Sequence, residues 1–331
     1  MESSTFGPFE IGRCLGEGGF SVVYEAYDQE LARKVALKLI RPQVVFTREG
    51  RHRFMREVEA ARRLRHRHIV PVLRAGFYNG QGYVSMELMS GGTLYEFQRR
   101  QKVLDPQTTA RVVRHVAQGL DYARHKGIIH RDVKPSNIFF RADRVVCLGD
   151  FGMAKVRGMS QVTRTNDVIG TVHYMAPEQV RGLIHMTAAS DIYSLGVVLY
   201  EMVTGRRPFD HPSQAVLLHA IAHLPPPRPR DVNPSVTPQV ERVLLQALSK
   251  EPGRRFQWAS QLAAAYQAAL ERDRVFISSA PPARRAVGQR AKPGTHPPTA
   301  TGQRTVVQQP GFWIFLLALL AFLLFLSTQT P

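Results

Sequence analysis

Four short segments carry residues that suit the binding and transfer of a phosphate group. The glycine-rich stretch GEGGFS at 16–21 lies between two apolar stretches, and VALKLI follows with Lys38. Further along come HRDVKPSN at 130–137 and GDFGMAK at 149–155. Glycine lets a backbone approach phosphates closely, and carboxylate and amide oxygens suit Mg²⁺. A glycine-rich turn alone could equally be a tight hairpin, so the order and separation of all four segments carry the prediction of phosphoryl transfer.

The elements that must position these residues fall into two groups. Residues 9 to about 103 read as a sheet-rich lobe with one helix, and 105–270 as a larger lobe of helices. The expected strands are FEIGRCL, SVVYEAYD, KVALKLI, IVPVLRAGFY and GYVSMEL, with the helix over 54–64. The expected helices of the second lobe include 108–126, 188–204 and 237–248, with short strands near 137–149.

On these motifs, residues 9–270 resemble the catalytic domain of eukaryotic-type (Hanks-type) protein kinases, most closely the bacterial membrane-tethered Ser/Thr kinases. The resemblance implies an α+β, bilobal protein-kinase fold. A small β-rich N-lobe would cover about 9–89 and a larger α-helical C-lobe about 90–270. A flexible linker and one C-terminal transmembrane helix are expected to follow.

The resemblance places ATP between the lobes. Lys38 would hold the α- and β-phosphates, fixed by an ion pair with Glu57, with Glu59 as the rival partner. Ser21 stands where a third glycine of the loop is common, which the family tolerates. Met86 would be the gatekeeper beside the adenine. The nucleotide-binding residues implied are Leu15, Gly16, Glu17, Gly18, Gly19, Phe20, Ser21, Val22, Val23, Ala36, Lys38, Met86, Glu87 and Met89.

The catalytic roles also follow from the resemblance. Asp132 would accept the proton of the substrate hydroxyl, and Lys134 would steady the γ-phosphate. Asn137 and Asp150 would bind Mg²⁺, with Mn²⁺ as an alternative metal. Three further residues are given structural roles, namely Glu178 pairing with Arg255 and Asp191 bracing the catalytic loop.

The segment between Asp150 and Glu178 bears on specificity and control. Lys134 in its motif and Gly170-Thr171 favour Ser/Thr over Tyr substrates in this family, with Thr171 as a structural contact to the catalytic loop. Thr163 and Thr165 match the activation-loop threonines of the bacterial kinases, so autophosphorylation there is expected; two ordinary loop threonines are the alternative. A phosphate at that place would pair with Arg131.

The chain is strongly basic, with a formal net charge of +18. Residues 48–67 hold eight arginines against three glutamates. Such a run is a solvated helix face, a nucleic-acid patch or a surface for anionic lipid. Because Glu57 must face inward toward Lys38, this helix cannot give all its faces to a nucleic acid. No nucleic-acid partner is therefore expected. The two cysteines, Cys14 and Cys147, form no disulfide framework or zinc-ligand spacing.

The C-terminal part changes composition twice. Residues 276–310 are rich in Pro, Ala, Gly, Thr and Arg, a composition that cannot bury enough surface to fold, and read as a linker. Residues 311–328, which include an uninterrupted apolar run over 312–326, would span about 27 Å as a helix. A core helix is the alternative. Basic residues before the run and none after it predict a cytoplasmic kinase domain with the C-terminus on the far side of the cell membrane.

The function expected from these features is ATP-dependent phosphorylation of protein Ser/Thr hydroxyls in membrane-associated signalling. A pseudokinase or nucleotide-binding scaffold is the alternative, because Gly149 before the DFG segment is unusual for the family. The intact set of Lys38, Asp132, Asn137 and Asp150 argues against that alternative. Partners would be protein substrates and the membrane, and homodimerisation is left open.

Overall fold

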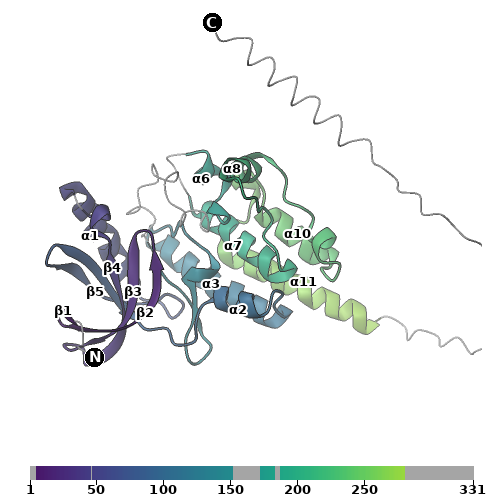
Figure 1. The fold of residues 1–331 in the computed structure, drawn as a ribbon. Helices are drawn as coiled ribbons and strands as arrows, with labels where there is room; N and C mark the ends of the chain where they lie inside the picture. Colours follow the sequence, from purple (N-terminus) through teal and green to yellow (C-terminus); the bar gives the residue numbers. More distant parts are fainter. Residues whose placement is uncertain (1–4, 46, 152–171, 183–186, 280–331) are drawn as a thin grey trace, which may run out of the picture. The chain divides into compact units, whose positions relative to one another are not determined.

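The computed structural model describes residues 5–45, 47–151, 172–182 and 187–279 (Figure 1). The predicted linker beyond 279 and the apolar segment 311–328 lie outside the described residues. Within the described part, no helix combines the length and apolarity that a membrane crossing requires.

An antiparallel sheet forms the N-terminal lobe and confirms the predicted strands. Its order is β1-β2-β3-β4-β6-β5. The strands are β1 (Thr5–Phe6), β2 (Phe9–Gly18), β3 (Ser21–Asp28), β4 (Arg33–Ile40), β5 (Val72–Tyr78) and β6 (Gln81–Glu87). The short helix η1 (Pro42–Val44) follows β4. One sheet therefore carries both the glycine-rich stretch and the lysine of VALKLI.

Helix α1 (Arg48–Arg62) packs against this sheet and begins earlier than the apolar spacing predicts. The Thr47 hydroxyl accepts a hydrogen bond from the Gly50 N–H and so caps the first turn. That turn is exposed and rich in arginine, and it carries no apolar periodicity to read. The buried face of the helix consists of Phe54, Glu57, Val58 and Ala61.

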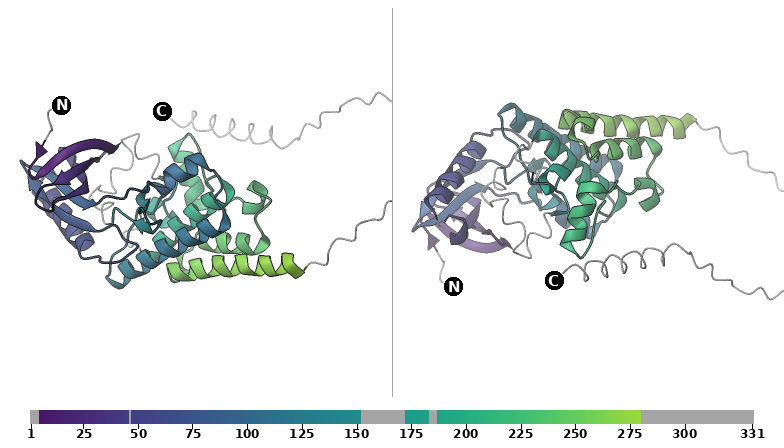
Figure 2. Two further views of the ribbon diagram at one scale, coloured as in Figure 1. Left: turned by 90° about the horizontal axis from the view of Figure 1, so that it is seen from below. Right: turned by 90° about the horizontal axis from the view of Figure 1, so that it is seen from above.

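The C-terminal lobe is mostly helical (Figure 2). Its helices are α2 (Leu94–Arg100), α3 (Pro106–His125), α6 (Pro177–Val180), α7 (Ala188–Thr204), α8 (Gln214–His223), α9 (Pro229–Val232), α10 (Pro238–Ala247) and α11 (Ala259–Ser279), with the short η2 (Pro135–Asn137) and η4 (Pro252–Arg254). The strands β7 (Ile138–Phe140) and β8 (Val146–Leu148) pair antiparallel. Helix α11 reaches Ser279, so residues 276–279 are helical and the predicted linker begins too early.

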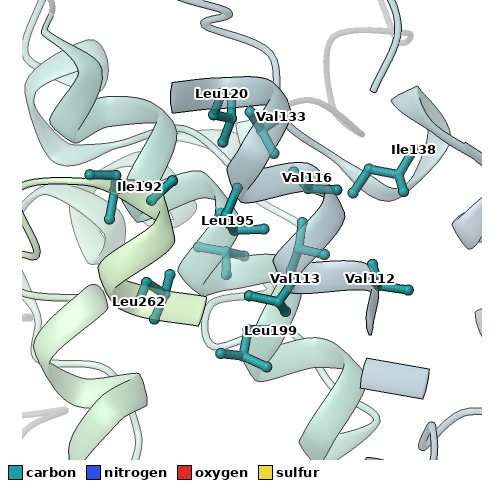
Figure 3. Close-up of a cluster of buried hydrophobic side chains, with 14 of the residues drawn as sticks. Val112, Val113, Val116, Leu120, Val133, Ile138, Ile192, Leu195, Leu199 and Leu262 are labelled. Atoms are coloured by element: carbon teal, nitrogen blue, oxygen red, sulfur yellow. The ribbon is translucent and has the colours of Figure 1, made fainter. Parts of the chain in front are cut away.

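The core of this lobe lies among α3, α7 and α11 (Figure 3). Val116, Leu195 and Leu262 are fully buried there. Helix α7 is buried along almost its whole length, and its bounds match the predicted 188–204. Each large aliphatic side chain removed from water contributes about 1.5–3 kcal/mol, so this packing fixes α7 and what it carries.

A buried ion pair ties α6 to the segment before α11. Arg255 donates from both Nη atoms to the two oxygens of Glu178, at 2.7 and 2.8 Å, and confirms the predicted pair. The two residues are 3% and 5% exposed. Burial alone would raise the pKa of Glu178, but the hydrogen bonds and charge of Arg255 outweigh it and lower that pKa.

Arg255→Ala is expected to cost about 3–5 kcal/mol of unfolding free energy, because it leaves a buried carboxylate without its cation. Arg254→Ala is the matched control: its pair with Glu251 is exposed, so the loss should stay below about 1 kcal/mol. Urea unfolding at neutral pH measures both. Since the folded pKa of Glu178 is lowered, the contribution of the pair is present above its unfolded pKa and disappears as pH falls through the folded value. Equal stabilities of the two variants would contradict this assignment.

Candidate active site

The glycine-rich stretch is a β-hairpin. Gly18 pairs with Ser21 across β2 and β3, which leaves Gly19 and Phe20 as the two turn residues. Ser21 also pairs with Ile40 of β4, so it lies inside a regular ladder. A strand position accepts serine as readily as glycine, and the missing third glycine is therefore no defect. The first residues of the hairpin face solvent, with Leu15 40% exposed.

Lys38 reaches across from the N-lobe sheet to Asp150, just after β8. Its Nζ lies 2.7 Å from both carboxylate oxygens, and the side chains are only 5% and 17% exposed. On the same strand Ala36 pairs with Met86 of β6. Lys38, Met86, Asp150 and Phe151 line one pocket. The structure thus brings together the predicted phosphate-binding, gatekeeper and metal-binding residues.

The predicted ion pair between Lys38 and Glu57 stays a prediction, and both residues are buried. Glu57 does face inward, 9% exposed on the buried side of α1. Its charge acts on Arg131: burial lowers the pKa of that guanidinium, while Glu57 and Asp191 raise it. Lys38 also contacts Asp150, because the residues after β8 bring that carboxylate next to β4.

The segment after β6, here called the hinge, is expected to bind the adenine base. One of its backbone donors is used within the fold. The Glu87 N–H donates to the Pro71 carbonyl at 3.0 Å, so Glu87 does not offer this donor to a base. The Glu87 carboxylate lies 3.3 Å from Arg141. Met89 follows, partly buried. Recognition of a base by the hinge therefore depends on its other backbone groups.

The catalytic loop gathers the predicted side chains around Asp132. The Asn137 amide donates to the Asp132 carbonyl at 2.8 Å and to its Oδ2 at 3.2 Å. Lys134 Nζ lies 3.0 Å from the same Oδ2. Asp132 is 5% exposed. A carboxylate held in this way has a fixed direction, which a general base needs.

Asp191 of α7 braces this loop, as predicted. Its two carboxylate oxygens accept the backbone N–H groups of His130 and Arg131, at 2.8 and 2.7 Å. Arg131 has a φ of 69°, a left-handed conformation that costs free energy in a non-glycine residue. The Asp191 carboxylate and a 3.1 Å hydrogen bond from Gln179 to the Arg131 carbonyl hold it there.

His130 links the loop to the Asp150 segment. Its Nδ1 accepts from the Asp132 N–H at 3.2 Å, so Nε2 carries the proton and donates to the Gly149 carbonyl at 2.7 Å. A Cβ at Gly149 would lie 2.8 Å from the Phe139 ring and 3.2 Å from Val70. Only glycine fits this close approach, which gives the unusual residue before the DFG segment a structural reason.

The donor set suits a magnesium ion bound together with phosphates. No cluster of three His, Cys, Asp or Glu side chains with metal-site geometry occurs within the described ranges. Mg²⁺ commonly takes one or two protein oxygens and completes its shell with phosphate and water. Asp150 supplies a carboxylate, and Asn137 keeps its amide oxygen because its nitrogen faces Asp132. Both predicted ligands fit this role.

Three predicted residues, Thr163, Thr165 and the structural Thr171, lie outside the described residues. Two contributors were missed from the sequence: Gln179, which supports Arg131, and Arg41, which contacts the glycine hairpin at Gly18 and Glu17. A single arginine after a strand carries no pattern that would single it out.

The chain belongs to the protein kinase domain family, whose model matches residues 9–267. It is 40% identical over 268 residues to the serine/threonine-protein kinase PknD of Mycobacterium tuberculosis, covering 81% of this chain and 40% of PknD. It is 36% identical over 271 residues to PrkC of Bacillus subtilis, covering 81% of this chain and 41% of that one. The chain thus spans about two fifths of the length of these relatives.

Solved structures agree with the fold. A crystal structure of the PknI kinase domain of Mycobacterium tuberculosis superposes with a TM-score of 0.66 at 29% sequence identity. The match covers 82% of this chain and 99% of that domain. The bilobal kinase fold expected from the motifs is therefore confirmed for the described part.

Asp191→Ala should lower kcat for protein phosphorylation about 100-fold, because the strained loop relaxes and Asp132 shifts. The KM for ATP should change far less, since Lys38 and Ala36 lie on β4, away from Asp191. Asp191→Asn keeps one acceptor and should be intermediate. Steady-state kinetics measure kcat and KM, and circular dichroism checks that the variants are folded. A normal kcat in Asp191→Ala would refute the bracing role.

Proposed function

We propose that the chain is a protein kinase that transfers the γ-phosphoryl group of ATP to Ser or Thr hydroxyls of proteins. The observation that carries the proposal is the placement of Asp132 among Lys134, Asn137 and the Asp191-braced backbone. On the other side of the cleft, Lys38 and Asp150 supply the cation and carboxylate that handle the phosphates and their metal.

The residues would divide the reaction as follows. The Asp132 carboxylate accepts the hydroxyl proton of the substrate and orients the oxygen for in-line attack. Lys134, beside it, offers its ammonium group to the transferring phosphoryl oxygens. Lys38 binds the other phosphates. When bound by Asn137 and Asp150, Mg²⁺ neutralises charge on the β- and γ-phosphates.

A nucleotide-binding scaffold without transfer is the second candidate. It shares the hairpin, the pocket and Lys38, so ATP binding does not discriminate between the two. The Asp132 environment favours catalysis, because a pure binding module has no need to hold that carboxylate with two side chains and a strained neighbour. Turnover is the deciding measurement.

Activation by autophosphorylation at Thr163 and Thr165 is part of the proposal. Its support is Arg131, a half-buried cation beside Asp132 with Glu57 and Asp191 as its neighbouring charges. A phosphate on the segment before Glu178 would carry close to two negative charges and bring an anion within reach of this guanidinium. The pairing would order the substrate-binding side of the cleft.

The chain incubated with Mg²⁺ and ATP should acquire phosphate on Thr163 or Thr165, mapped by mass spectrometry. Asp132→Asn, folded and ATP-binding, should acquire none. Thr163→Ala combined with Thr165→Ala should lower activity toward an added protein at least about tenfold, as loss of an ordering phosphate predicts. Full activity of that double variant with no phosphate in the segment would remove autophosphorylation from the account.

We place the kinase domain on the cytoplasmic side of the cell membrane, anchored by residues 311–328. The support is the uninterrupted apolar run at 312–326, together with Arg284, Arg285, Arg290, Lys292 and Arg304 before it. The run is short, so a second attraction between basic residues and anionic lipid would strengthen the anchoring.

The full chain should remain in the membrane pellet after alkaline carbonate extraction, while a chain ending at Ser279 should be released. A full-length chain with Leu319→Arg and Leu320→Arg should also be released, because each central arginine costs about 2.5–3.5 kcal/mol of insertion. It is the matched control for chain length. Extraction of the unaltered full chain by carbonate would contradict the anchor.

A further inference from the structure

Arg41, the first residue after β4, contacts the glycine hairpin at three residues, Glu17, Gly18 and Phe20. Its backbone N–H donates to the Phe20 carbonyl at 2.9 Å. Its Nε donates to the Gly18 carbonyl at 3.1 Å, and its Nη2 lies 2.6 Å from the Glu17 carboxylate. One arginine therefore holds both sides of the turn formed by Gly19 and Phe20.

The glycines of the hairpin leave open space around the backbone near its tip. A Cβ placed at Gly16 would meet nothing within 4 Å, and one at Gly18 would approach only the Ser21 carbonyl, at 3.8 Å. The ladder between β2 and β3 shifts register between Cys14 and Gly16. Glycines add conformational freedom of their own. The ladder between β2 and β3 holds the hairpin up to the Gly18–Ser21 pair, and the side chain of Arg41 adds polar restraints at Glu17 and Gly18.

These contacts also set the direction of the backbone. In a trans peptide the C=O of one residue and the N–H of the next point in opposite directions, and no cis peptide occurs in the described chain. The Gly18 carbonyl faces the Arg41 guanidinium, so the Gly19 N–H points away from it, out of the hairpin. That donor is then held ready for an acceptor such as a phosphate oxygen.

Arg41 further connects the hairpin to the phosphate-binding lysine. Lys38 and Arg41 are three residues apart on one stretch of chain, and Lys38 is fixed by its pair with Asp150. Arg41 therefore links the position of the hairpin tip to β4, the strand that carries Lys38. The Arg41 and Glu17 side chains are 38% and 65% exposed, so their ion pair adds little to global stability.

We propose that Arg41 is a positioning residue that holds the glycine hairpin in the conformation that binds the nucleotide phosphates. The inference rests on the proposed kinase function, but it concerns binding and not transfer. It predicts a loss confined to phosphate-bearing ligands. A merely structural arginine would instead affect folding, or all ligands of the cleft equally.

The test compares the full chain in detergent with Arg41→Ala, Arg41→Lys and Glu17→Gln, using calorimetric titration with Mg²⁺-ATP and with adenosine. Arg41→Ala should weaken ATP binding about tenfold, as expected for loss of a charge-assisted hydrogen bond, and leave adenosine affinity unchanged. Arg41→Lys should be intermediate, and Glu17→Gln should weaken ATP about twofold. The KM for ATP should follow the same order, with kcat changing less.

Arg13→Ala is the matched control. Arg13 lies in the same hairpin and also forms a short ion pair, 2.8 Å to Glu25 of β3, but touches no turn residue. It should leave ATP affinity unchanged. The melting temperatures of all variants should agree within about 3 °C. Unchanged ATP affinity in Arg41→Ala, equal losses for ATP and adenosine, or an equal loss in Arg13→Ala would each overturn the proposal.

Failure of this inference is separable from failure of the proposed function. Titration requires no turnover, so a chain that binds ATP but transfers no phosphate still reports on Arg41. Conversely, if the chain is an active enzyme and Arg41→Ala binds ATP as tightly as the unaltered chain, the kinase function stands and only the positioning role of Arg41 is lost.

Discussion

The ion pair between Lys38 and Asp150 is the contact on which the site depends. It joins a strand of the N-terminal sheet to the segment after β8, at 2.7 Å and largely out of solvent. The pair connects the sheet that carries the glycine hairpin to the segment that His130 links to the catalytic loop. The attraction is strong because burial limits solvent screening, and it fixes the separation between β4 and the segment after β8.

Rigid elements on each side transmit that constraint. On the catalytic side, α7 is buried along almost its whole length and presents Asp191 to the backbone of His130 and Arg131. Its packing supplies the free energy that keeps a non-glycine residue at positive φ beside the base. On the nucleotide side, β4 carries Lys38 and ends at Arg41, which holds the hairpin. Catalytic geometry is thus a property of a packed helix and a paired strand.

Most of the architecture could be predicted from the sequence, because its signals are local or periodic. The helix at 188–204 has apolar residues on every face, and the strands alternate or cluster in the usual way. The motif order located Lys38, Asp132, Asn137 and Asp150. The early start of α1 was missed because its first turn is capped by Thr47 and faces solvent. The contact between Lys38 and Asp150, the role of Gly149 and that of Arg41 depend on distances between separate elements, which no single segment encodes.

The central claim is that Asp132 acts in the transfer step while Lys38 and the hairpin act in binding. Rapid-quench measurement of phosphoryl transfer from γ-labelled ATP to an added protein, beside ATP titration, tests it most directly. The account predicts that Asp132→Asn binds ATP as tightly as the unaltered chain and transfers the label at least about 100-fold more slowly. Transfer at an unaltered rate by Asp132→Asn would contradict it.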